Sequence, residues 1–513
     1  MIKGYNCIAG VWESNENAKT FQTVNPGTKE ILPTKFQEAN TAQIEKAVLE
    51  AGQCATQFRQ TSAAAKANFL IAIKSEIEER SVSILACYMQ ESGLPEGRAK
   101  GEMQRTLDQI DRFVELLREG SYVQATLNTS GSDLRKMLVS IGPIVVFGAS
   151  NFPLAFSTAG GDTISALAAG CPVIIKAHPY HAGTSEWVAR AIVSAAEKQE
   201  LPKGVFSHLG GASHDVGSQL VTHSMVKGVG FTGSFAGGKA LYNLAQNRKI
   251  PIPVFAEMGS INPIFILENK RHSDSNLALS IAQSITLGTG QFCTNPGLIV
   301  VYDTKHKKDF GNELLQHIKE MELPPMVHQS IQERYDAQIE DLKNCSAVKA
   351  MHFSPKCTAI IGVTSADKFL DTPSLSEEVF GPFTLVVECS NWEEIKAIAL
   401  HLEGQLTATI LGDEEDAKVM SILMPLLEEK VGRLLFKGLP TGVVVTKAMQ
   451  HGGPFPATTD GRYTSVGTDA IYRWLRPVAY QDCPDNLLPE ALQNNNPLKI
   501  LRHVNGVMTM NVL

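Results

Sequence analysis

Apolar and polar residues alternate along the chain with two different periods. Between about residues 40 and 120, apolar residues recur every three or four positions, which predicts amphipathic helices. Gly93 and Gly120 lie where two of these helices are expected to end. The helical pattern covers AQIEKAVLEAGQCATQFRQ, AAAKANFLIAIKSEIEERSVSILACYMQESG and GEMQRTLDQIDRFVELLREG.

Between about residues 140 and 256, short β-branched runs alternate with helical patterns. Strands that alternate with helices of this length form right-handed βαβ units around a parallel sheet. We therefore expect a doubly wound α/β domain, with ligands at the carboxyl ends of its strands. Its strands are predicted in LVSIGPIVVFGA, CPVIIKAH, GVFSHLG, KGVGFTG and PIPVFAEM. A second block of the same kind follows, with INPIFILE, PGLIVVYD, TAIIGVTS, FTLVVECS and LTATILGD.

Two segments depart from these patterns. SYVQATLNTSGSDLRKM is polar and rich in serine and threonine, and we interpret it as an excursion from the first domain. The tail from about residue 478 is rich in proline and asparagine, and an irregular conformation is expected there. The fold class is therefore α/β, with two doubly wound domains and a smaller additional region.

Composition narrows the possible functions. The chain has 513 residues, 43% hydrophobic and 19% charged, and a formal net charge of -7, which is unlike the basic surface of a nucleic-acid-binding protein. Its nine cysteines show no CxxC spacing, so neither a disulfide framework nor a zinc site is predicted. No signal peptide or membrane span is evident. These features favour a cytoplasmic enzyme with reduced thiols.

Three separated residues could supply the groups that thioester chemistry needs. Cys293 lies in the turn GQFCTNPG, Glu257 ends the apolar strand PIPVFAEM, and Asn151 follows another strand in FGASNFPLAF. Such chemistry requires a thiolate, a general base and a hydrogen-bond donor for the developing oxyanion. Taken singly, a cysteine in a turn is usually inert and a glutamate at a strand end is usually solvated.

The segment GFTGSFAGG, with Gly233 and Gly238, joins a predicted strand to a predicted helix. Backbone N–H groups and a helix N-terminus in such a turn can bind a pyrophosphate, although many such turns bind nothing. Lys176, at the end of the strand CPVIIKAH, lies where a cofactor ribose or phosphate would bind; a lone lysine there can equally be a solvated charge.

Five ordered motifs, GASNFPL, GFTGSxxxG, AEMGSINP, GQFC and EEVFGPF, resemble the aldehyde dehydrogenase superfamily. The resemblance implies a nucleophile at Cys293, a general base at Glu257 and an oxyanion site at Asn151 with the Cys293 backbone N–H. The thioester is then hydrolysed to an acid, and no metal is required. The residues implied to contact a nicotinamide dinucleotide are Lys176, Gly233, Ser234, Gly238, Glu378 and Phe380.

The same resemblance divides the chain into regions. It implies a Rossmann-like cofactor-binding domain, a catalytic domain, a loop returning to the cofactor domain, and an oligomerisation region that makes a homodimer or homotetramer. These regions are 1–121 with 141–256, then 257–450, then 451–477, and finally 122–140 with 478–513.

Many NAD-preferring members of the family carry a glutamate three residues after the cofactor lysine, where this chain has Pro179. Without that carboxylate, a 2′-phosphate is not repelled, so NADP is the expected cofactor and NAD remains possible. His178, His181 or His214 could lie close enough to favour the phosphate.

The C-terminal motif HGGPFPATTDGRYTSVG, with GEMQRTLDQ, resembles a branch containing α-ketoglutaric semialdehyde dehydrogenases and a related long-chain aldehyde dehydrogenase. The leading hypothesis is oxidation of 2,5-dioxopentanoate, whose carboxylate calls for an arginine such as Arg105 or Arg462. Phe152 and Phe156 are expected to line the tunnel, or else to be core. The alternatives are a medium- or long-chain aldehyde dehydrogenase, a thiol hydrolase without nucleotide, and a silent binding protein.

Overall fold

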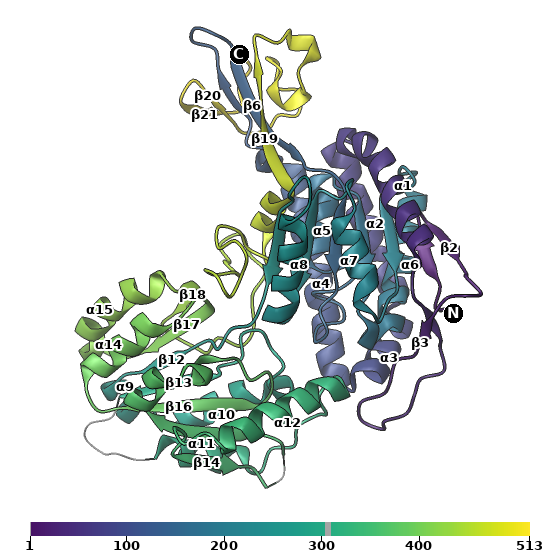
Figure 1. Ribbon diagram of the computed structural model, residues 1–513. Helices are drawn as coiled ribbons and strands as arrows, with labels where there is room; N and C mark the ends of the chain where they lie inside the picture. Colours follow the sequence, from purple (N-terminus) through teal and green to yellow (C-terminus); the bar gives the residue numbers. More distant parts are fainter. Residues whose placement is uncertain (1, 303–308, 356) are drawn as a thin grey trace.

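The computed structural model describes residues 2–302, 309–355 and 357–513. Two α/β bodies lie side by side, and a third, smaller sheet projects from the first of them (Figure 1). The predicted fold class is confirmed. Among the described residues, no helix combines the length and the apolar character that crossing a membrane requires.

The first body contains a seven-stranded sheet in the order β11-β10-β7-β8-β9-β1-β2. The five predicted strands are present and run parallel, because a crossover helix joins each of them to the next. Two short antiparallel strands near the N-terminus extend the sheet and were not predicted. The strands are β1 (Asn6–Ile8), β2 (Val11–Glu13), β7 (Ile144–Phe147), β8 (Val173–Lys176), β9 (Phe206–Leu209), β10 (Gly228–Thr232) and β11 (Val254–Glu257).

Helices cover both faces of this sheet (Figure 1). Gly93 and Gly120 end their helices in the left-handed conformation, with φ of 65° and 81°, as predicted. The second predicted helix is divided in two, because Arg80 leaves helical geometry at φ -95° and ψ 5°. The helices are α1 (Thr41–Gln60), α2 (Ala63–Glu79), α3 (Ser81–Ser92), α4 (Glu96–Glu119), α5 (Gly161–Ala169), α6 (Ala182–Lys198), α7 (His214–Thr222) and α8 (Phe235–Gln246).

The second body contains another seven-stranded sheet, in the order β14-β15-β16-β13-β12-β17-β18. Its five inner strands coincide with the predicted runs, and the two edge strands were not predicted. The strands are β12 (Ile264–Ile266), β13 (Leu298–Tyr302), β14 (Ala350–Phe353), β15 (Ile360–Ser365), β16 (Phe383–Cys389), β17 (Gln405–Leu411) and β18 (Val431–Leu435). The helices are α9 (Glu268–Ser273), α10 (Leu277–Thr286), α11 (Phe310–Ile318), α12 (Gln329–Lys343), α13 (Ala366–Asp371), α14 (Trp392–His401) and α15 (Ala417–Glu428).

The projecting five-stranded sheet joins the polar excursion to the C-terminal tail. The tail is not wholly irregular: Asn505 and Gly506, at φ 48° and 90°, form a tight hairpin turn that the Asn-Gly pair could have predicted. Its strands are β5 (Thr126–Asn128), β6 (Leu134–Ser140), β19 (Leu475–Gln481), β20 (Arg502–Val504) and β21 (Val507–Thr509). A separate pair, β3 (Thr20–Phe21) and β4 (Phe36–Gln37), lies near the N-terminus.

Candidate active site

A strained turn holds Cys293 between the two bodies' sheets. The turn precedes β13, and Gly288, Thr289 and Gly290 all have positive φ, of 56°, 57° and 66°. A Cβ on Gly290 would lie only 2.2 Å from the Gly381 carbonyl oxygen, so only glycine fits there. The close approach fixes the backbone just before Cys293.

The backbone after the cysteine is fixed by a buried amide. Asn262 Nδ2 donates hydrogen bonds to the carbonyl oxygens of Cys293 and Asn295, each at 2.9 Å. Asn262 is fully buried and itself has a positive φ of 45°. The nucleophile candidate is therefore held from both sides, as a preorganised group should be.

Three side chains from distant parts of the sequence meet at this turn. Cys293 Sγ lies 3.4 Å from His451 Nε2, and His451 Nε2 lies 2.9 Å from Glu257 Oε1. Glu257 ends β11, and its other carboxylate oxygen accepts a hydrogen bond from Ser465 Oγ. Glu257 and His451 are buried, whereas Cys293 is partly exposed and can be reached.

The electrostatics of the three groups are coupled. Burial and the adjacent carboxylate of Glu257 raise the pKa of the Cys293 thiol well above its usual range, while the Arg105 guanidinium opposes the rise. Burial also acts to raise the pKa of Glu257, but the attraction of His451 and its hydrogen bonds hold that pKa below its usual value. The carboxylate is therefore ionised at neutral pH beside a protonated thiol.

His451 is a site residue that the sequence analysis missed. It begins the HGGPFP motif, which was noted for the resemblance it carries and not for this side chain. It lies 158 residues from Cys293 in the chain, so no local spacing relates the two. Only the fold brings them together.

Asn151 follows β7 and lines a cleft of about 180 Å³ on one side of the Cys293 turn. Its Nδ2 donates a hydrogen bond to the Gln291 carbonyl oxygen at 2.9 Å. This bond orients the amide beside the turn. The second N–H of the amide is left for another acceptor.

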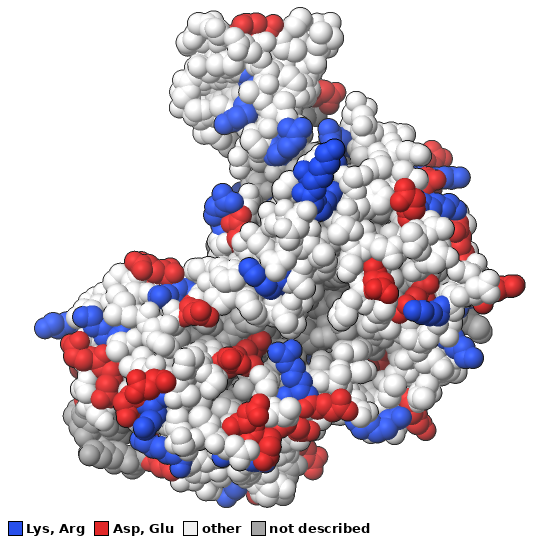
Figure 2. All heavy atoms as spheres, in the orientation of Figure 1, with Lys and Arg blue, Asp and Glu red and all other residues white. Residues whose placement is uncertain are grey.

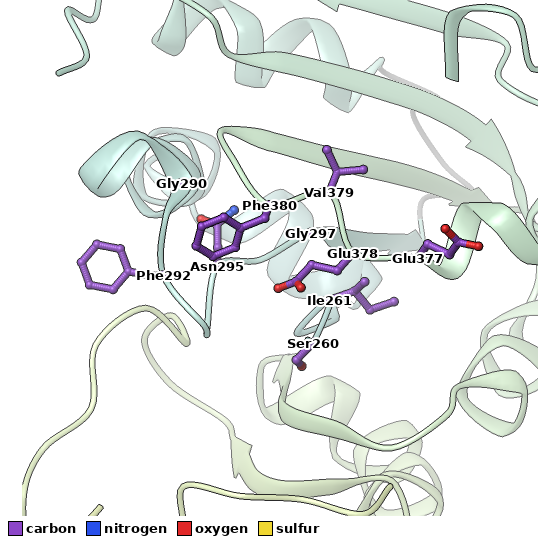
Figure 3. Close-up of a pocket in the computed structure, with 10 residues that line it drawn as sticks. All are labelled: Ser260, Ile261, Gly290, Phe292, Asn295, Gly297, Glu377, Glu378, Val379 and Phe380. Atoms are coloured by element: carbon purple, nitrogen blue, oxygen red, sulfur yellow. The ribbon is translucent and has the colours of Figure 1, made fainter. Parts of the chain in front are cut away.

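A second cleft, with about 260 Å³ of empty space, lies on the other side of the turn and includes Glu378 and Phe380. Figure 3 shows the Glu378 and Glu377 carboxylates pointing in opposite directions from adjacent positions. Burial raises the pKa of Glu378 to about 7, and a backbone hydrogen bond from Ser260 opposes the rise only in part. A carboxyl group in this position can bind a hydroxyl group as donor or acceptor.

The remaining predicted cofactor residues lie at the carboxyl edge of the first sheet. Lys176 ends β8, and burial lowers the pKa of its amine to about 8. Ser234 caps α8 by accepting a hydrogen bond from the Gly237 N–H at 3.3 Å. A Cβ on Gly238 would lie 2.6 Å from Met258 Sδ, and one on Gly233 would lie 2.7 Å from a ring carbon of Phe231. Close packing against neighbouring side chains therefore disfavours a larger residue at both positions.

Aromatic rings cover the Asn151 side of the turn. Phe152 packs edge-to-face against Phe156 and Phe292, with ring centroids 5.3 and 5.2 Å apart. The Arg98 guanidinium lies 4.3 Å from the Phe152 ring centroid and 4.4 Å from that of Phe292. Arg98 also lies 3.6 Å from Glu102, so its charge is partnered. Arg98 and Phe292 were not predicted as site residues.

The two predicted arginines lie in different environments. Arg105, on α4, stacks at 4.9 Å on the Phe156 ring, and both of its terminal nitrogens are buried without a hydrogen-bond partner in the described part of the chain. Burial lowers the pKa of Arg105, and nearby carboxylates oppose this. Arg462 is 81% exposed and pairs with Asp460. The geometry therefore favours Arg105 over Arg462 as an anion-binding group.

Comparison with known proteins identifies close relatives. The family model "Aldehyde dehydrogenase family" matches residues 12–426. "Alpha-ketoglutaric semialdehyde dehydrogenase 2" from Azospirillum brasilense is 43% identical, over 99% of this chain and 98% of that protein. "Alpha-ketoglutaric semialdehyde dehydrogenase" from Acinetobacter baylyi is 41% identical, over 96% and 97%. A solved structure, 1-pyrroline-5-carboxylate dehydrogenase from Thermus with bound NAD, superposes with a TM-score of 0.79 at 18% identity, covering 94% of this chain and 93% of that one.

Proposed function

Because this chain belongs to the aldehyde dehydrogenase family and oxidises aldehydes with a nicotinamide dinucleotide, we propose that its substrate is 2,5-dioxopentanoate and its product 2-oxoglutarate. Both relatives named for that semialdehyde are more than 40% identical over almost the whole chain. The structural observation that carries the proposal is Arg105, a buried cation with two unpartnered nitrogens beside the aromatic cluster. A substrate carboxylate would satisfy both nitrogens at once.

We propose that Cys293 is the nucleophile and that His451 supplies the N–H that steadies its thiolate. His451 Nδ1 is buried with no partner among the described residues, so we assign the proton to Nε2, which faces both Glu257 and Cys293. The thiol proton is released to solvent before attack, and the thiolate left behind has an N–H donor at 3.4 Å. The thiolate sulfur attacks the aldehyde carbon, and the Asn151 amide stabilises the resulting oxyanion.

The nicotinamide ring supplies the hydride acceptor when the dinucleotide is bound. On this chain's side, Glu257 then accepts a proton from the water that attacks the thioester, and the acid is released as the Cys293 sulfur leaves. The low pKa of Glu257 keeps the carboxylate available as a base at neutral pH. The Glu378 cleft and the Ser234 cap of α8 fit the sugar and phosphate groups of the dinucleotide.

We propose NADP as the preferred cofactor, with NAD as the second choice. The proposal rests on Pro179, which leaves no carboxylate at the position where one would repel a 2′-phosphate. Burial keeps the pKa of His178 well below its usual value, so this imidazole adds no charge that would attract the phosphate. His181 Nε2 is bound to the Ala149 carbonyl oxygen at 2.7 Å. Initial rates with each dinucleotide test the preference directly.

A second candidate substrate class is a medium- or long-chain aliphatic aldehyde. The aromatic cluster of Phe152, Phe156 and Phe292 favours it, because apolar rings bind alkyl chains well. Oxidation of 2,5-dioxopentanoate, hexanal and decanal should be compared as kcat/KM. We expect the dioxo acid to be preferred by at least about a hundredfold, the value of a buried charge pair. A preference for decanal would overturn the substrate assignment.

Substitution of Arg105 sharpens that test. We expect Arg105→Met to lower kcat/KM for 2,5-dioxopentanoate by about a hundredfold more than kcat/KM for hexanal, since the carboxylate then enters an apolar site unpaired. Loss of the guanidinium also raises the pKa of the Cys293 thiol, which should slow both substrates equally. Arg462→Met is the matched control, because Arg462 is exposed and its expected effect on both substrates is negligible. Equal losses on both substrates would show that Arg105 acts on the Cys293 thiol or on the fold and not on the substrate carboxylate.

We propose that the projecting sheet mediates assembly into a homodimer or homotetramer. Its edge strand β21 exposes Val507 and Met508, at 63% and 55%, and an unpaired edge of this kind invites another strand. On the face seen in Figure 2, this sheet carries few charged side chains compared with the rest of the molecule. All nine cysteines are free thiols, which supports the further proposal of a cytoplasmic location.

A further inference from the structure

The three polar groups at the active site also have the spacing of a metal site. One ligand atom each from Glu257, Cys293 and His451 can be chosen so that all lie within 4.8 Å of one another. Ligand atoms about 2.0–2.3 Å from a tetrahedral zinc ion are separated by about 3.3–3.6 Å. The sulfur-to-nitrogen distance of 3.4 Å already matches that separation, and the nitrogen-to-oxygen distance of 2.9 Å needs to widen only slightly.

We propose that Zn²⁺ binds reversibly to Cys293, His451 and Glu257 and inhibits the enzyme by occupying its nucleophile. A thiolate, an imidazole and a carboxylate form a donor set that zinc accepts, with a fourth position left for water. Magnesium and calcium prefer oxygen ligands alone, so they are not expected to compete. The inhibition rests on the proposed role of Cys293, whereas the binding itself does not.

Charge balance supports the site. The thiolate of Cys293 and the carboxylate of Glu257 together neutralise a divalent cation in a buried place where a lone charge is unfavourable. The ion replaces the thiol proton, which is released to solvent. The partial exposure of Cys293 provides the route by which the ion enters.

The surroundings of His451 Nδ1 favour reversible zinc binding over a permanent structural zinc site. When Nε2 binds the ion, the ring proton must move to Nδ1, which is buried and has no acceptor in the described part of the chain. Zinc-bound histidines normally donate that second N–H, and its loss weakens binding about 10–100-fold. The chain is therefore expected to bind zinc reversibly and to remain folded when the ion is removed.

Calorimetric titration of the metal-free, full-length protein with zinc chloride tests the site without relying on turnover. We expect one zinc ion to bind per chain and magnesium not to bind. Cys293→Ala and His451→Phe should each lower the affinity by more than about a hundredfold, because each removes a direct ligand. Cys483→Ala is the matched control, since this free cysteine lies in the tail, away from the turn, and its removal should change nothing.

Two further readouts keep the test decisive if a variant folds poorly. Cobalt bound to the wild-type protein should give the near-ultraviolet sulfur-to-metal absorption of a thiolate ligand, and zinc should inhibit competitively with aldehyde. Zinc binding that survives Cys293→Ala, or cobalt without that absorption, would overturn the proposal. The dehydrogenase assay in a chelator-containing buffer tests the proposed function separately. Absence of aldehyde oxidation in that assay would count against the proposed function and would not affect the zinc-binding result.

Discussion

Two carboxyl groups, the buried Glu257 and the partly exposed Glu378, flank the Cys293 turn, and their pKa values are shifted in opposite directions. Glu257 has its pKa held below the usual value, whereas Glu378, at the cleft across the turn, has its pKa raised to about 7. Burial acts in the same direction on both. The difference is that Glu257 has the His451 ring 2.9 Å away and a hydrogen bond from the Ser465 hydroxyl, while Glu378 has a single backbone donor.

Neighbouring groups, and not burial alone, therefore determine the chemistry of the two carboxyl groups. An ionised carboxylate beside the nucleophile can act as a base toward water. A carboxyl group that titrates near neutrality can instead exchange hydrogen bonds with the hydroxyl groups of a sugar. The same residue type thus serves the reaction on one side of the turn and recognition on the other.

Removing the ionised carboxylate should have the largest effect. Glu257→Gln keeps the size of the side chain but cannot accept a proton, so steady-state turnover should fall by about 10²–10⁴-fold. Formation of the thioester does not use the water that Glu257 activates. A burst of reduced nicotinamide, about one per active chain, should therefore remain in rapid-mixing experiments. Glu403→Gln, at an exposed glutamate after α14 that lines neither cleft, is the control. Loss of the burst together with turnover would assign Glu257 to the first step instead.

Removing the His451 imidazole should raise the pKa of Glu257 toward that of Glu378. His451→Phe keeps a ring but no N–H, so burial should raise the pKa of Glu257 and leave more of it protonated at pH 7. A carboxyl group acts as a base only when it is ionised, so activity at pH 7 should fall by about 10–100-fold, which corresponds to the loss of a charge-assisted hydrogen bond. Activity should recover as the pH is raised. The pH–rate profile measures this shift. His401→Phe, at an exposed histidine of α14, is the control, and an unshifted acidic limb would contradict the coupling.

Much of the framework of this site could be predicted from the sequence, because each part has a local signal. β-branched runs marked the five parallel strands of the first sheet and the five inner strands of the second, and the ends of β11 and β8 placed Glu257 and Lys176. The antiparallel strands β1 and β2, at three residues each, are too short to show a period. Arg98 could have been found, since it lies seven residues before Arg105 and hence on the same face of α4.

The partnership of His451 could not be predicted in this way. A loop residue far along the chain has no periodicity that points toward Cys293, and its position depends on how that loop returns to β11. The loop returns through the hydrogen bond from the Met258 N–H to the Ala457 carbonyl oxygen, at 2.8 Å. Such long-range pairing follows from the packing of complete domains and not from local sequence.

The smallest expected effect concerns Glu378 and stability. A carboxyl group whose folded pKa is about 7, against 4.5 for the ordinary group, favours the folded state below pH 4.5, and this contribution is lost as the pH rises through 7. Glu378→Gln stays neutral and avoids that loss. In the absence of dinucleotide, we expect the variant to be more stable than the parent by about 1–2 kcal/mol at pH 8, after allowance for partial exposure, and equally stable near pH 4.5. Denaturant unfolding at both pH values measures the difference. A difference independent of pH would mean that Glu378 is not the titrating group.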